Sequence, residues 1–109
     1  MRLADLANKM MTRASMMACT QTSIDAEDIE SLKRWRDTIA QGLSPDCTAV
    51  HQLNEAIKFA TSDFAQQPGS EARAQVATVL VAIMVAAAAG ALLEAIRKTD
   101  NEPKDADAW

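Results

Sequence analysis

The stretch Ala74–Leu93, with the sequence AQVATVLVAIMVAAAAGALL, holds twenty consecutive residues without a charge, and eight of them are Ala. At about 1.5 Å per residue these residues make a helix roughly 30 Å long, which matches the hydrocarbon thickness of a bilayer. A helix that is apolar all round lies either in a membrane or at the centre of a protein core. We therefore expect residues 70–98 to form one long apolar helix, in either of those two places.

Small side chains recur every four residues along this helix. The stripe that they form consists of Ala74, Thr78, Ala82, Ala86 and Gly90. Small residues at this spacing let two helix backbones approach closely. In a membrane the stripe predicts self-association of the chain, whereas in a soluble bundle it predicts that this helix is the tightly packed central one.

Three amphipathic segments precede the apolar helix within residues 1–66. Each carries apolar residues at helical spacing. The three faces are Leu3, Leu6, Ala7, Met10, Ala14 and Met17; then Ile29, Leu32, Trp35 or Arg36, Ile39 and Leu43; then Val50, Leu53, Ile57, Ala60 and Phe64. Ser23 or Asp25 is expected to cap the second helix and Gly42 to end it, while Ser44-Pro45 opens the third.

Composition agrees with an all-helical chain. Aromatic residues make up 4% of the 109 residues, with three Gly and three Pro, so the chain lacks the turn and strand residues of a β fold. We expect an all-α fold, a small bundle of three to four helices whose fourth helix is Ala-rich and nearly all apolar. Residues 1–98 form the single domain, and 99–109 form a disordered acidic tail.

The location of the apolar helix decides the cell compartment. Its charge-free length favours a membrane span. The three apolar faces upstream favour a buried central helix, because without it about 65 residues would have to form a core alone. Asp5, Asn8, Lys9 and Arg13 interrupt any signal-peptide core before the lipobox-like end at Cys19, so we expect no cleavable signal peptide and leave membrane and cytoplasm open.

We expect no catalytic residues, no metal and no cofactor. Cys47, His51 and Glu55 share one helix face, but the first and last are roughly 12 Å apart along the axis, too far for a single ion. One His and no glycine-rich loop leave too few groups for a catalytic or phosphate site. Cys19 and Cys47 are open to one disulfide or to two free thiols.

Four methionines and one tryptophan are the candidate partner contacts: Met10, Met11, Met16, Met17 and Trp35. Flexible thioethers suit an adaptable binding surface and equally suit a core stripe. Basic residues surround Trp35 in Lys33-Arg34-Trp35-Arg36, and nearby carboxylates make a solvated face the simpler interpretation. Trp109, behind the acidic tail, is open to docking on a partner.

A net charge of −4 argues against nucleic acid as a partner. The sequence therefore predicts a non-enzymatic small helical protein that acts through protein–protein association, with a membrane anchor that self-associates through helix 70–98. The alternative is a soluble helical-bundle adaptor, chaperone or inhibitor that binds another protein, with helix 70–98 buried at its centre.

Overall fold

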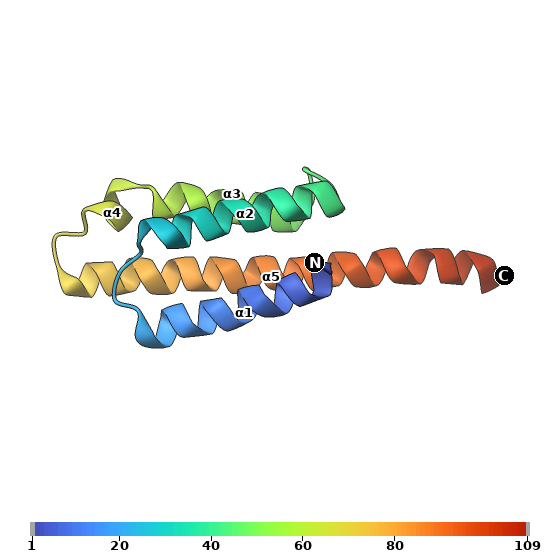
Figure 1. The fold of residues 1–109 in the computed structure, drawn as a ribbon, viewed down its shortest axis with the longest axis horizontal. Coiled ribbons are helices and arrows are strands. Elements are labelled where there is room, and N and C mark those ends of the chain that lie inside the picture. Colours follow the sequence, from blue (N-terminus) through green and yellow to red (C-terminus); the bar gives the residue numbers. More distant parts are fainter. Residues whose placement is uncertain (1, 109) are drawn as a thin grey trace.

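The computed structural model describes the backbone of residues 2–108 and the side chains of residues 2–99. Over that range every regular element is a helix, so the predicted all-α bundle is confirmed. The elements are α1 (Leu3–Thr20), α2 (Ala26–Gly42), α3 (Thr48–Ala60), α4 (Asp63–Gln66) and α5 (Glu71–Ala108). The four long helices run alternately in opposite directions, and α4 is a single turn between α3 and α5 (Figure 1).

Helix α5 lies between α1 and α3 and packs against both, while α2 packs mainly on α3 (Figure 1). At about 1.5 Å per residue its 38 residues span roughly 57 Å, which accounts for the 59 Å length of the molecule. One face of α5 is buried in the bundle. Its fully enclosed members are Ala77, Thr78, Val81, Ala82, Val85, Ala88, Ala89 and Leu92.

The same helix is also long and apolar enough to cross a membrane. Over Glu71–Thr99 an 18-residue window reaches a mean hydropathy of 2.6, and 44% of that window is buried inside the bundle. Length and composition alone therefore fit a membrane span, and the packing of α5 fits a core helix.

The apolar face predicted for α1 forms the core, because Leu6, Ala7, Met10, Ala14 and Met17 are all buried. On α2 the buried members are Leu32, Trp35 and Ile39, so Trp35 and not Arg36 faces inward. Asp25, one of the two predicted caps, is the N-cap of α2, and its carboxylate accepts a hydrogen bond from the Asp28 amide.

The third helix differs from its prediction at both ends. It begins at Thr48 with Cys47 as its N-cap, because Ser44–Cys47 form a separate hydrogen-bonded turn. It ends at Ala60, and the hydroxyls of Thr61 and Ser62 bind carbonyls of its last turn. Phe64 therefore falls on α4, where it is exposed and contacts Phe59, instead of lying on the predicted core face.

Gly42 is the last residue of α2, but it does not adopt the left-handed conformation predicted for it. Among the described residues only Gly69 has a positive φ, of 78°, as a turn glycine. A Cβ on Gly42 would lie 3.1 Å from the Leu3 side chain, so the absent side chain lets α1 and α2 approach closely there.

The backbone of α5 continues as helix to Ala108, over the segment 99–109 for which the sequence predicts a disordered tail. Extending a helix costs little once its first turns exist, so a segment joined directly to α5 can continue it. The side chains of residues 100–109, including Trp109, lie outside the described residues.

Candidate binding cleft between α1 and α2

Helices α1 and α2 follow each other in the chain but pack together far less closely than either packs on its other neighbour. They enclose an open cleft of about 430 Å³. Eight side chains line it: Lys9, Thr12, Arg13 and Met16 from α1, and Glu27, Ser31, Arg34 and Trp35 from α2. This volume lies in the range of ligand sites in proteins, and its walls combine cations with an apolar surface.

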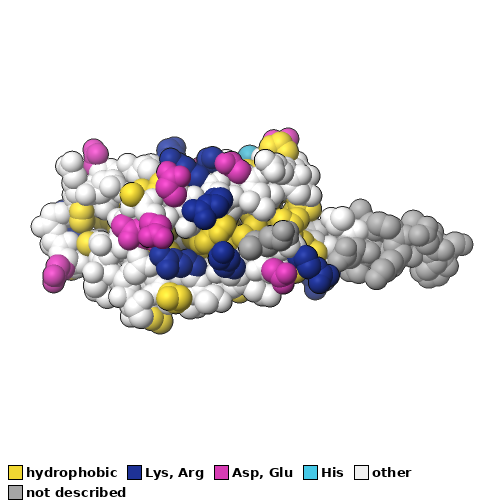
Figure 2. Space-filling view, viewed as in Figure 1, with side chains coloured by type: hydrophobic (Ala, Val, Ile, Leu, Met, Phe, Trp, Pro, Cys, Tyr) yellow, Lys and Arg dark blue, Asp and Glu magenta, His cyan; other side chains and the backbone are white. Residues whose placement is uncertain are grey.

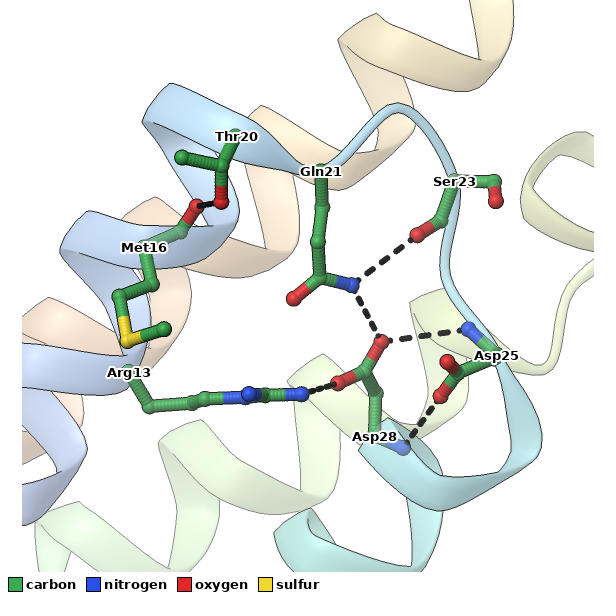
Figure 3. A network of polar contacts seen from close by, with 7 residues as sticks. All are labelled: Arg13, Met16, Thr20, Gln21, Ser23, Asp25 and Asp28. Atoms are coloured by element: carbon green, nitrogen blue, oxygen red, sulfur yellow. Dashed lines mark hydrogen bonds and ion pairs between the residues drawn. The ribbon is translucent and has the colours of Figure 1, made fainter.

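A polar network joins α1 to α2 near the connection between the two helices (Figure 3). The Asp28 carboxylate accepts hydrogen bonds from Arg13 Nη2 at 2.6 Å, from Gln21 Nε2 at 2.8 Å and from the Asp25 amide at 3.2 Å. In turn, the Asp25 carboxylate accepts a hydrogen bond from the Asp28 amide, which completes a capping box. The Asp28 side chain is 2% exposed, so these donors replace its water.

The network keeps both partners charged. Burial alone would raise the pKa of Asp28, but the hydrogen bonds from Arg13, Gln21 and the Asp25 amide outweigh it and hold this pKa below its ordinary value. The hydrogen bond to Asp28 likewise raises the pKa of Arg13. The Arg13 wall of the cleft is therefore a fixed cation.

Two further cations line the cleft. Lys9 and Arg34 make no salt bridge with any described side chain. Figure 2 shows this face of the molecule, with Lys and Arg side chains on both sides of hydrophobic ones. The cleft thus holds three cations against the carboxylate of Glu27 on a chain whose net charge is −4.

The basic run around Trp35 separates into two groups in the structure. Arg34 lines the cleft, whereas Lys33 lies 3.9 Å from Glu30 and Arg36 lies 3.0 Å from Asp37. Arg36 also donates to Asn54 of α3 and so helps to hold α2 on that helix. Lys33, Arg34 and Arg36 are neighbours in the sequence, but of the three only Arg34 lines the cleft.

The candidate contact residues also divide by location. Met10 and Met17 are buried in the core, with 0% and 2% exposure. Met16 and Trp35 line the cleft, although Trp35 presents only 8% of its surface. Met11 lies on another side of α1, in a hollow next to α5.

The small-residue stripe of α5 faces partly into the bundle. Thr78 and Ala82 are buried, Ala74 and Ala86 are half buried, and Gly90 is exposed. Ala82 and Ala86 lie with Ala14, Ser15 and Ala18 of α1 around one hollow, so much of this stripe serves packing inside one chain. A Cβ on Gly90 would meet nothing within 4 Å.

The residues considered for metal binding and thiol chemistry are spread over the bundle. His51 and Glu55 line a hollow with Ile83 of α5, and Cys47 caps the start of α3. Cys19 and Cys47 are free thiols, near the end of α1 and the start of α3, which lie at opposite ends of the bundle (Figure 1). Among the described side chains no three His, Cys, Asp or Glu residues are arranged to hold a metal ion.

Sequence reasoning missed the part of Arg13 and Gln21 in this site. Arg13 lies off the apolar stripe of α1, and Gln21 follows the last residue of that helix, so neither belongs to a predicted face. One signal was available, because Asp25 and Asp28 stand three residues apart at a helix start, which is the spacing of a capping box. It does not reveal that the second carboxylate also binds α1.

Comparison with protein-family models, characterised proteins and solved structures finds no match to this chain.

Proposed function

We propose that this protein is a non-enzymatic helical bundle that binds another protein in the cleft between α1 and α2. The observation that carries the proposal is the lining of that cleft, where Lys9 and Arg34 flank the apolar surfaces of Met16 and Trp35 without ion-pair partners among the described side chains. The segment of the partner protein that fits this cleft carries carboxylates beside an apolar side chain. Charge complementarity would orient that segment, and apolar burial would hold it.

The bundle gives this site a firm base. The Arg13–Asp28 pair fixes α1 to the start of α2, and Arg36 ties α2 to α3 through Asn54. Since both walls are held by other helices, the cleft needs little reorganisation on binding, and that reduces the free-energy cost of association. Met16, 49% exposed and flexible, supplies the adaptable contact.

The experiment places a photo-reactive amino acid at Ser31, on the cleft wall, and cross-links it in cells that produce the protein. We expect capture of a protein whose cross-linked peptide is acidic and contains an apolar residue. The double variant Lys9→Glu/Arg34→Glu should lose the capture, because it places like charges opposite the ligand.

A matched control is Lys33→Glu/Lys58→Glu, which changes the net charge equally but outside the cleft. It should keep the capture, as should removal of the exposed Cys19. Equal capture by both double variants, or by a photo-reactive group at Asp37 instead of Ser31, would contradict the proposal.

The second candidate function is a membrane anchor. It is favoured by the mean hydropathy of 2.6 in α5. Withdrawal of α5 into a bilayer would uncover the faces of α1 and α3 that it covers, at a cost proportional to that apolar area. For this reason we place the bundle first and the anchor second.

A further inference from the structure

Helix α5 carries a second apolar surface, which points away from the bundle. Val76, Leu80 and Ile83 are 50%, 37% and 58% exposed. Ala87 and Gly90 continue the line and are also exposed. The five residues follow one another at spacings of 4, 3, 4 and 3, the heptad spacing by which one helix keeps contact with another. We call these five residues the outer ridge.

We infer that the outer ridge binds the outer ridge of a second copy of this chain, with the two α5 helices antiparallel. This contact lies on α5 and involves none of the residues that line the α1–α2 cleft, so it is independent of the proposed function. A two-fold axis beside Ile83 relates the two copies. Such an interface is isologous, because each copy offers the same surface.

The sizes of the side chains favour the antiparallel orientation. The N-terminal half of the ridge is large, with Val76 and Leu80, and the C-terminal half is small, with Ala87 and Gly90. Antiparallel pairing about Ile83 sets each large half against the partner's small half. Parallel pairing would set large against large and leave a gap where the small halves meet.

The charges at the two ends of the ridge favour the same orientation. Arg73 stands before it, exposed and without a salt bridge to any described side chain, and Glu94 stands after it. Because the two lie at nearly equal distances along the helix from Ile83, the antiparallel pair brings Arg73 of each copy opposite Glu94 of the other. Parallel pairing would place each charge opposite its own kind.

Glu94 also has a partner on its own helix. Glu94 is paired with Arg97 of its own helix, an exposed i, i+3 pair that contributes little and can rearrange. No charged residue stands within the ridge itself.

The surface beside Ile83 can receive a partner. A hollow of about 210 Å³ lies on its α1 side, next to Met11 and Ala18, and one of about 270 Å³ lies on its α3 side, next to His51. In the dimer the two exposed Ile83 side chains lie beside each other. The hollows on either side of each Ile83 let the two identical surfaces fit together.

Disulfide trapping tests the orientation in the full chain with Cys19→Ser and Cys47→Ser. The double variant Leu80→Cys/Ala87→Cys should oxidise to a covalent dimer. The two new thiols lie roughly 10 Å apart along one helix, beyond disulfide reach within a chain. Each single variant should give roughly fivefold less dimer, since its two copies sit on opposite sides of the two-fold axis. Efficient trapping by either single variant would establish parallel pairing and overturn the inference.

Sedimentation of the untreated chain over a range of concentrations provides the second readout. Arg73→Glu should weaken the dimer roughly tenfold, and Arg73→Glu/Glu94→Arg should restore it. Ile83→Glu should abolish the dimer while leaving the helical signal intact, since Ile83 is exposed in the single chain. Lys9→Glu/Arg34→Glu, in the cleft, should not change dimerisation, so the two proposals fail separately.

A membrane surface is the other occupant that the ridge could have. Vesicles of phosphatidylcholine and phosphatidylglycerol test it. A chain that stays monomeric at every concentration, or that binds vesicles through Ile83 without self-associating, would overturn the inference.

Discussion

Arg13 and Asp28 form the contact that fixes how α1 meets α2. Arg13→Ala would leave the Asp28 carboxylate, 2% exposed, with only Gln21 and the Asp25 amide as donors. Removing one partner of a fully buried pair costs about 3–5 kcal/mol. Arg13 keeps 35% of its side chain in solvent, so we expect a smaller loss of about 2 kcal/mol in unfolding free energy. Urea unfolding measures this loss of unfolding free energy.

The control is Arg36→Ala, at the more exposed pair with Asp37, which should cost under about 1 kcal/mol. Equal losses in the two variants would contradict this ranking.

The same carboxylate gives stability a defined dependence on pH. Its pKa in the folded chain lies below the ordinary value of 3.8, so the unfolded chain binds the proton more tightly. Asp28 therefore contributes stability above pH 3.8 that is lost as the pH falls through 3.8 toward its folded pKa. Unfolding free energies between about pH 5 and pH 2.5 should fall less steeply in Asp28→Asn than in the wild-type chain. Equal slopes in the two proteins would show that other carboxyl groups cause the acid sensitivity.

At the scale of the helix, α5 has an inner and an outer side that respond differently to substitution. Ala82 is 3% exposed and faces α1, so Ala82→Ile should overpack the core and cost about 1–3 kcal/mol. Gly90→Ala should instead stabilise the single, undimerised chain by about 0.5–1 kcal/mol, since its new Cβ meets nothing within 4 Å there and Gly disfavours helices. Thermal melts of the two variants measure the difference. A neutral Ala82→Ile would mean that α5 does not pack on α1 in solution.

The helices themselves were predictable because their signals are local. The faces of α1 and α2 follow from apolar spacing, and Asp25 follows from capping chemistry. The interruption at Thr61 was not visible, since hydroxyl groups that bind the preceding turn also occur inside unbroken helices, as Thr38 does in α2. Apolar spacing alone therefore predicts Phe64 on the core face of the third helix, although it lies on α4.

The site was less predictable than the helices because it depends on how helices are placed relative to one another. Spacing puts Trp35 on the inner face of α2, but it does not say that α2 leans toward α3 and opens a cleft against α1. Likewise, the sequence of α5 is apolar all round, and only the packing separates Ala82, inside the bundle, from Ile83, outside it. Both distinctions depend on how whole helices pack against one another, which the residue pattern within one helix does not specify.

At the scale of the whole molecule, the two places open to α5 exclude each other. In the bundle it covers the apolar faces of α1 and α3, and in a bilayer it would leave those faces without cover. We therefore expect the expressed chain to remain in the supernatant after an alkaline carbonate wash. It should also melt in a single cooperative transition without detergent. Retention in the washed pellet with release only by detergent would contradict the bundle.

One substitution separates the two states more sharply than fractionation of the wild-type chain. Ile83 stands near the middle of Ala74–Leu93, so Ile83→Glu would put a carboxylate near the centre of a membrane span, at a cost of about 3 kcal/mol of insertion free energy. In the bundle the same side chain is 58% exposed, so the glutamate reaches water and the cost is small.

The matched control is Val85→Glu. Val85 is buried in the bundle and would lie at a similar depth in a membrane span. If α5 is a core helix, Ile83→Glu should keep the melting temperature within a few degrees at concentrations too low for dimerisation, and Val85→Glu should unfold the chain. If α5 spans a membrane, both variants should reduce insertion to a similar extent, and that equality would decide against the bundle.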